Sequence, residues 1–445
     1  MKLTVLNKCL WMLFIVSLLF IPSSSNAYSV LTHEALIDAS WDKSILPLLK
    51  KKFPQATPAD FKLAHSYAYG GSLMSDIGYS PFGSTYFTNL IHYVRTGDFV
   101  ENLLSEAQNL NEYAFALGSL CHYMGDSYGH ALGTNLVEPI VYPKVGAKFG
   151  KVVTYEEDHA AHTRTELAFD VLQLARSNYA SQEFHDLIGF NVAVPVLERA
   201  FYKTYGQDIN EIFGNIDHSV NNFRWAVNSL MPTVTRSAWL LKKNEIKQMQ
   251  PGITARKFHY TMERKKYYKE FGRDHDKPKF KERVIAFIIT ILPKVGPFKA
   301  FRFKEIGPDG EKQFIRSFDT VMNHYAEALA RLHYENISLP NVNFDTGKQT
   351  ILGDYGLTDA TYGQLMLKLQ ENKFSYLTNN LKQNLVNFYN NADTVALAQK
   401  DTSLWKKTNV AIQEVKIATP ITVDSLKSAE AIQDQKRVIK ISGNK

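Results

Sequence analysis

The segment 117–133, LGSLCHYMGDSYGHALG, carries His122, Asp126 and His130 at intervals of four residues among apolar neighbours. On one α-helix each such step turns about 400°, so the three side chains lie within about 80° of one another on one face. The surrounding Leu, Ala, Cys, Met and Gly residues indicate burial on several sides. Because unpartnered His and Asp side chains are costly to bury, this segment predicts a buried helix whose polar face needs compensation.

Helix geometry limits what the row can bind. His122 and His130 lie about 12 Å apart along the helix axis, too far to hold one ion, whereas residues four apart are separated by about 6 Å. The row therefore suits a cluster of two or more metal ions with Asp126 near its middle. The alternative is a helix whose histidines are satisfied by hydrogen bonds to neighbouring groups.

Further imidazole and carboxylate groups are present in the N-terminal half of the chain. His162 and Glu166 repeat the four-residue spacing on a second predicted helix, and His159 is the weaker rival because Thr163 stands where an acid would be needed. The other candidates are His33, Asp76 and His92. Nitrogen and oxygen ligands without thiolate pairs favour zinc in a hydrolytic rather than a structural site.

The rest of the chain reads mainly as helix. Apolar residues recur at three- and four-residue spacing in the segments 100–118, 166–176, 220–242, 316–333 and 363–390. Prolines and glycines predict a loop over 133–157 and a connector over 336–362. From about residue 400 no element is clear, and the tail is expected to be flexible. We expect an all-α fold.

The N-terminus has the pattern of a secretory signal peptide. Lys2 and Lys8 precede the apolar run 9–22, and small residues stand at −3 and −1 of a cleavage site after Ala27. We expect removal of residues 1–27, export of the chain and a mature N-terminus at Tyr28; the alternative is an uncleaved anchor helix. Cys121 would then be the one remaining cysteine, which excludes an internal disulfide.

Positive charge is concentrated in one block. Without Lys2 and Lys8 the formal charge is 49 − 44 = +5, and residues 251–300 carry 13 Lys/Arg against 5 Asp/Glu. Within this block basic residues are interleaved with Phe and Tyr over 256–283, and the apolar run 284–292 follows. The pattern suits peripheral contact with a membrane through 256–301, a solvated helix beside a core helix, or binding of a single-stranded nucleic acid.

These residues, in this order, resemble the zinc-dependent phospholipase C superfamily. That group includes single-strand-specific zinc nucleases and the N-terminal domain of glycosylphosphatidylinositol-specific phospholipase D. The resemblance covers about residues 28–175, and "THEA" and "HYMGD" are its most specific parts. It implies an all-α multi-helix bundle and about three zinc ions that hydrolyse phosphodiesters. Beyond the part that it covers, we expect an additional helical C-terminal region.

The resemblance also implies a role for each candidate residue. One zinc would be held by His92, His122 and Asp126, a second by His130, His162 and Glu166, and a third by His33, Asp126 and the backbone of Tyr28. Asp76 matches the carboxylate that orients or deprotonates the attacking water. The sequence departs from the family pattern at Tyr28, usually Trp, and at His130, which follows Asp126 by four residues rather than six.

The expected domain organisation has four parts: a signal peptide (1–27), a catalytic domain (28–250), a basic and apolar helical extension (251–345) and a C-terminal region of unknown role (346–445). The expected function is that of an exported phospholipase C acting on phospholipids, with no obligate protein partner evident. The alternatives are a zinc nuclease or nucleotidase, a phospholipase D-type enzyme, and a non-catalytic metal- or membrane-binding protein.

Overall fold

The protein is all-α, as its sequence predicts. The computed structural model describes residues 30–80, 83–175, 189–224, 304–390 and 402–421, with isolated positions between 227 and 254. Within these ranges the regular elements are helices, and β-pairing is limited to the isolated bridges Val342–Gln349 and Thr378–Ile421. None of the described helices is long and apolar enough to cross a membrane.

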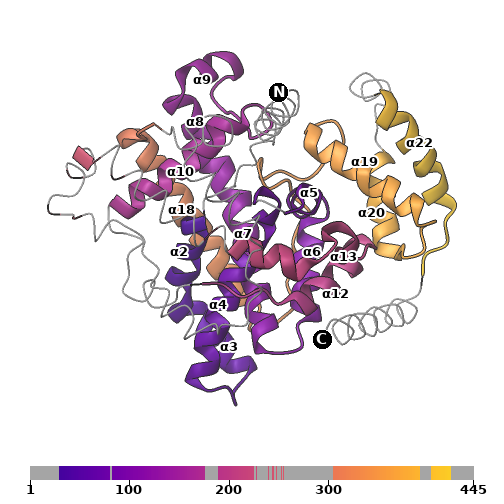
Figure 1. Cartoon of the computed structure of the whole chain (residues 1–445), viewed down its shortest axis with the longest axis horizontal. Coiled ribbons are helices and arrows are strands. Elements are labelled where there is room, and N and C mark those ends of the chain that lie inside the picture. The colour runs from indigo at the N-terminus through magenta and orange to yellow at the C-terminus, as the bar shows by residue number, and fades with distance from the viewer. Residues whose placement is uncertain are drawn as a thin grey trace, which may run out of the picture.

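The helices that carry or adjoin the candidate residues come first in the chain (Figure 1). They are α2 (Val30–Ser40), the π-helix η1 (Trp41–Ile45), α3 (Leu46–Lys52), α4 (Pro58–Met74), the 3-10 helix η2 (Ser75–Tyr79), α5 (Thr85–Tyr93), α6 (Thr96–Glu106), α7 (Leu110–Gly129), the π-helix η3 (His130–Thr134), α8 (Asn135–Val141), α9 (Pro143–Phe149) and α10 (His159–Ala175). The later elements are α12 (Val194–Tyr205), α13 (Ile209–Phe213), α18 (Gly307–Arg331), α19 (Gly356–Glu371), α20 (Asn379–Asn390) and α22 (Thr402–Ile417).

Helices α4 and α7 form the centre of the fold. The α4 N-terminus is fixed by a capping box, in which Thr57 and Asp60 satisfy each other's backbone N–H groups, and by Pro58 in the first turn. The two helices touch backbone to backbone, because a Cβ atom at Gly71 would overlap the Phe115 carbonyl oxygen, and one at Gly118 would overlap that of Ala68. The sequence therefore brings α7 unusually close to α4.

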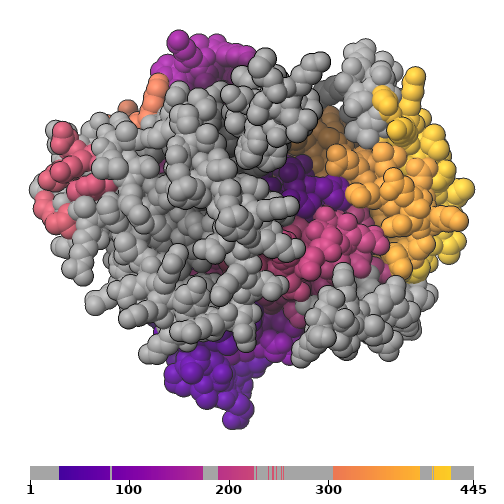
Figure 2. Space-filling model, viewed as in Figure 1, coloured from indigo at the N-terminus to yellow at the C-terminus, as the bar shows by residue number. Residues whose placement is uncertain are grey.

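The C-terminal helices share the core of the N-terminal ones. The hydroxyl of Tyr325 on α18 donates to the Leu117 carbonyl of α7 at 2.9 Å, and one continuous group of buried apolar residues extends from Val30 to Val415. Gly206, at the end of α12, lies against the segment that joins α19 to α20. Figure 2 shows the α13 surface adjoining the surfaces of α19 and α20 on one face. The described part of 304–421 thus packs as an integral layer of the molecule.

Several expected boundaries differ in the structure. The run 100–118 is divided between α6 and α7, and the run 363–390 between α19 and α20. The expected loop 133–157 is wrong over much of its length, since it contains α8 and α9. The predicted signal peptide, the basic block 256–301 and the tail after 421 lie outside the described residues, and the four-part domain division stays a prediction.

Candidate metal centre

Eight predicted site residues gather in one buried cluster. They come from four α-helices, one 3-10 turn and the first residue of a π-helix, and Tyr28 lies outside the described residues. The eight are His33 on α2, Asp76 on η2, His92 on α5, His122 and Asp126 on α7, His130 on η3, and His162 and Glu166 on α10.

Asp126 lies at the middle of this cluster. Its Oδ2 is 3.0 Å from His122 Nε2 and 3.3 Å from His92 Nε2. Its Oδ1 is 3.3 Å from His33 Nε2 and 3.9 Å from His130 Nε2. One carboxylate therefore faces four imidazoles, which is the arrangement of a bridging ligand between neighbouring ions.

The first group is formed by Asp76, His92 and His122, whose ligand atoms lie within 4.8 Å of one another. The Nδ1 of His92 lies 2.8 Å from the Thr88 carbonyl, and that of His122 lies 2.9 Å from the Ser72 carbonyl. A carbonyl only accepts hydrogen bonds, so each Nδ1 carries the proton and each Nε2 keeps its lone pair for an ion. The close approach of α4 to α7 places Ser72 within reach of His122.

Asp76 is close enough to this group to serve as a ligand. Its Oδ1 is 3.4 Å from His92 Nε2. The resemblance assigned Asp76 to the attacking water, and a carboxylate that contacts an ion can also hold a water beside it.

The second group consists of His130, His162 and Glu166. Glu166 Oε1 is 2.9 Å from His162 Nε2 and 3.4 Å from His130 Nε2, so both rings present the same nitrogen to one carboxylate oxygen. The π-helix η3 begins at His130, and this wider turn accompanies the four-residue step from Asp126. His159 is exposed, with its ring against Tyr155, and stands outside this group.

The third group combines His33 and Asp126 with His122. The rings of His33 and His122 are stacked, with centroids 4.4 Å apart. His122 and Asp126 thus face more than one group. The backbone ligands expected from Tyr28 lie outside the described residues.

The chemistry of these groups fits zinc. Within the described part of the chain, His92 Nε2, His122 Nε2 and both oxygens of Asp126 and of Glu166 are buried without a hydrogen-bond partner. Unpartnered polar atoms of this kind are rare, and a cation accounts for lone pairs that converge on one place. Imidazole nitrogen with carboxylate oxygen is a ligand set that zinc prefers in hydrolytic sites.

Burial drives the pKa values of the cluster apart. It lowers the pKa of His130 to about 4, and it raises that of Glu166 to about 8. At His92 burial also acts to lower the pKa, but the carboxylates of Asp126 and Asp76 outweigh it and raise the value to about 10. Nearby imidazolium charge, chiefly at His122, holds the pKa of Asp126 well below its usual range despite burial. The lowered pKa favours the anionic form of Asp126, which is the form that a metal ion requires of a carboxylate ligand.

Two buried carboxylates beside the cluster were missed by the sequence reasoning. Glu138 Oε2 is 3.4 Å from His162 Nδ1, and Asp345 Oδ1 is 3.6 Å from His130 Nδ1. Glu138 falls in the segment that was expected to be a loop. Asp345 lies 179 residues beyond Glu166 in the polar connector, where neither spacing nor periodicity relates it to the histidines.

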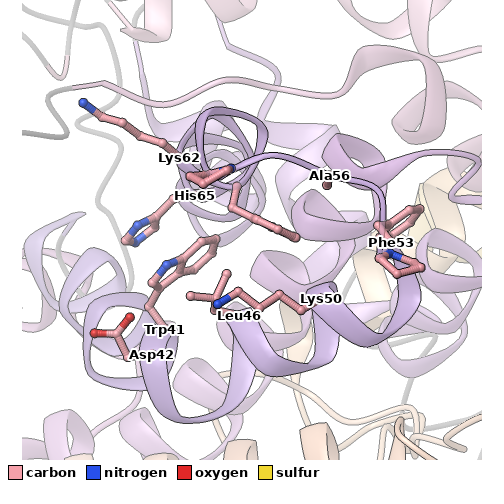
Figure 3. Close-up of a pocket in the computed structure, with 11 residues that line it drawn as sticks. Trp41, Asp42, Leu46, Lys50, Phe53, Ala56, Lys62 and His65 are labelled. Carbon is pink, nitrogen blue, oxygen red and sulfur yellow. The ribbon is translucent and has the colours of Figure 1, made fainter.

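A separate surface pocket of about 740 Å³ lies at α3 and the start of α4 (Figure 3). In it the ring of His65 stacks on Trp41 at 3.8 Å, while His65 Nε2 lies 3.1 Å from Asp38 Oδ1. His65 is thus satisfied by its neighbours and takes no part in the metal pattern. None of the eight cluster residues lines this pocket.

Comparison with known proteins supports the geometric reading. A family model described as zinc dependent phospholipase C matches residues 32–215. This range contains all eight cluster residues. No curated protein and no solved structure matches the chain.

Proposed function

The chain belongs to the zinc-dependent phospholipase C superfamily through residues 32–215, and on that premise we propose that it is an exported phospholipase C acting on glycerophospholipids. That it is a zinc-dependent hydrolase follows from the family. The observation that carries the finer proposal is the cluster of three buried ligand groups around Asp126. A phosphodiester, whose two non-bridging oxygens share one negative charge and gain more as water attacks, matches a centre of several cations.

Bound zinc supplies a water activated for attack near neutral pH and positive charge for the phosphoryl oxygens. Around it, His92 and His122 present Nε2, because the carbonyls of Thr88 and Ser72 keep the protons on Nδ1. Asp126, whose two oxygens face different histidines, would be a ligand shared by neighbouring ions. No protein nucleophile is required.

Asp76 is the proposed proton acceptor. It takes a proton from the attacking water as the new P–O bond forms, and the bond between phosphorus and the glycerol oxygen breaks. The released glycerol oxygen takes up a proton, so that the products are diacylglycerol and a phosphorylated head group. The Asp76 side chain is buried against His92, which fixes its position for this role.

Export is part of the proposal. Cleavage after Ala27 would free the α-amino group of Tyr28, and the resemblance implies that this group is a zinc ligand. Contact of residues 256–301 with a membrane surface would bring the centre to its substrate. N-terminal sequencing of secreted protein, together with its zinc content, tests the first of these points.

The deciding experiment measures products from purified mature protein given phosphatidylcholine or single-stranded DNA. Diacylglycerol and phosphocholine are expected. Phosphatidate and choline would indicate a phospholipase D, DNA cleavage without lipid turnover would indicate a nuclease, and bound zinc without turnover of either would indicate a non-catalytic protein. Each of these three outcomes overturns the proposal.

The matched variants are Asp126→Asn and Asp319→Asn. The first keeps the side-chain volume but removes the bridging charge, so we expect zinc content to fall and activity to drop more than about 100-fold. Asp319 is exposed on α18, and its variant should behave as the unmodified enzyme. Full activity of Asp126→Asn would contradict the assignment of the centre.

A further inference from the structure

The histidines of the first and second groups are supported in different ways. In the first group the Nδ1 atoms of His92 and His122 face backbone carbonyls. In the second group His162 Nδ1 faces Glu138 at 3.4 Å, and His130 Nδ1 faces Asp345 at 3.6 Å. A carboxylate behind a ligating imidazole fixes its orientation and raises its basicity more than a neutral carbonyl does.

The Asp345 oxygen that faces away from His130, Oδ2, fixes the orientation of the carboxylate. Its Oδ2 accepts hydrogen bonds from the Tyr355 hydroxyl at 2.8 Å and from the Tyr155 backbone N–H at 2.9 Å. Its Oδ1 is buried and has no hydrogen-bond partner among the described residues. The carboxylate is therefore clamped with one oxygen directed at His130.

Hydrogen bonds within the turn that carries Asp345, and a close contact with α7, fix the position of this turn beside the metal cluster. Asn343 Oδ1 accepts from the backbone N–H groups of Asp345 and Thr346, at 2.9 and 3.0 Å. Gly347 has φ +66° and lies so close to the Ser127 carbonyl of α7 that a Cβ atom would overlap it. Only glycine satisfies both conditions, so the local sequence specifies this contact with α7.

Two contacts tie the same turn to the ligand-bearing helices. The Asn135 side-chain amide donates to the Asp345 carbonyl at 2.7 Å, at the start of α8. The Phe344 N–H donates to the His92 carbonyl at 3.0 Å, and the Phe344 ring packs against the rings of His92 and His122. The turn thus covers the cluster, although it lies outside the range matched by the family model.

Glu138 supports the second histidine of the group from α8. Its side chain is fully buried, and neither oxygen has a hydrogen-bond partner among the described residues. His162 Nδ1 is the nitrogen that faces it, while His162 Nε2 faces Glu166. Glu138 and Asp345 therefore occupy equivalent places behind the two imidazoles.

We propose that Asp345 and Glu138 are positioning residues of the second metal group, so that the 341–347 turn of the polar connector 336–362 completes a zinc site whose ligands all lie in the family domain. The inference rests on the proposed zinc centre and does not depend on which phosphodiester is cleaved. It assigns a role to residues for which the sequence predicts only a connector.

The test measures zinc binding directly. Full-length mature protein and its Asp345→Asn variant are dialysed against zinc buffers of graded chelator strength, and bound zinc is counted by mass spectrometry. We expect one class of ion to weaken about 10- to 100-fold and the other classes to keep their affinity. Glu138→Gln should weaken the same class.

Asp354→Asn is the matched control, because Asp354 is exposed in the same connector and touches none of the histidines. Unchanged zinc binding in folded Asp345→Asn would overturn the proposal. So would an equal weakening of all classes together with a lower melting temperature, which would make the turn merely structural. If Asp345→Asn does not fold, Tyr355→Phe provides the test. This variant removes one of the two hydrogen bonds to Asp345 Oδ2, so it should weaken zinc binding at the same site by a smaller factor.

The two proposals fail separately. If the wild-type protein binds zinc in the second group but cleaves no phospholipid, and Asp345→Asn removes that zinc, then this inference stands and the phospholipase proposal is excluded. Phospholipid cleavage with unchanged zinc affinity in the variant would do the reverse.

Discussion

Cys121 precedes the first histidine of the α7 row and points away from it into the core. Its side chain is fully buried, and burial together with the charge of Asp126 raises the pKa of its thiol well above the ordinary value. Because the thiolate is the reactive form, each unit of pKa increase lowers reactivity about tenfold at a fixed pH below the pKa. Cys121 thus has the environment of a small core residue.

We therefore predict that Cys121 resists alkylation in the folded protein. In a chain beginning at Tyr28, where it is the only cysteine, iodoacetamide at about pH 8 should react at least about 100-fold more slowly than in guanidinium chloride. Mass spectrometry of the intact chain at timed intervals gives both rates. Comparable rates in the two states would mean that the thiol is accessible and that α7 is packed differently around it.

At the same scale, the sequence identified ligand residues but not the residues behind them. His122, Asp126 and His130 could be recognised because helix periodicity relates them to one another. Glu138 and Asp345 have no such relation to His162 and His130, since only tertiary packing brings α8 and the 341–347 turn to the cluster. Their burial is a property of the fold and leaves no local pattern in the sequence.

At the scale of elements, the crossing of α4 and α7 depends on glycines. Gly71 and Gly118 allow each helix to meet the other's backbone, and this approach puts the Ser72 carbonyl 2.9 Å from His122 Nδ1. Moving the helices apart would break the hydrogen bond that directs His122 Nε2 at the ions. Packing and metal binding are thus coupled at one contact.

We predict that Gly118→Ala lowers both stability and zinc affinity. The added methyl group meets a carbonyl oxygen that cannot move alone, so the loss should be at least as large as typical overpacking, about 1–3 kcal/mol of unfolding free energy. Denaturant unfolding and zinc titration measure the two effects. Leu63→Ala, on the exposed side of α4, should change stability by no more than about 0.5 kcal/mol. A Gly118→Ala protein of unchanged stability would show that the helices are not in backbone contact.

The helices over 133–157 show why proline misled the sequence interpretation. Pro143 stands in the first turn of α9, where its missing N–H is no loss. Pro139 lies inside α8 and cannot bond to the Asn135 carbonyl, but the backbone N–H of Val153 takes that acceptor at 3.0 Å. A residue outside the helix thus supplies the hydrogen bond that Pro139 cannot make, and local helix propensity could not reveal this. The all-α class itself followed from periodicity, because it depends on many helical segments rather than on any one boundary.

At the scale of the whole molecule, the helices around the metal cluster contribute to two groups of buried apolar residues: the large one that extends from Val30 to Val415, and a smaller one centred on α8, α10 and α18. α18 is joined to α7 through Tyr325, and the ring of Tyr93 on α5 packs on Tyr355, just before α19. The 341–347 turn lies over the cluster between these two contacts. The cluster is therefore surrounded by both halves of the described chain, and neither half can unfold without exposing it.

We accordingly predict that zinc stabilises the molecule as one unit. Each independent site should add about 2.7 kcal/mol when free zinc is 100 times its Kd, and one calorimetric transition should move upward as zinc is added. Hydrogen exchange should slow together in α7 and α19, since opening either helix uncovers the cluster. Magnesium, which prefers octahedral oxygen ligands, should leave the transition in place and serves as the control. Two transitions of which only one responds to zinc would mean that the C-terminal helices unfold independently, and the 341–347 turn would then be a cover that opens without releasing the ions.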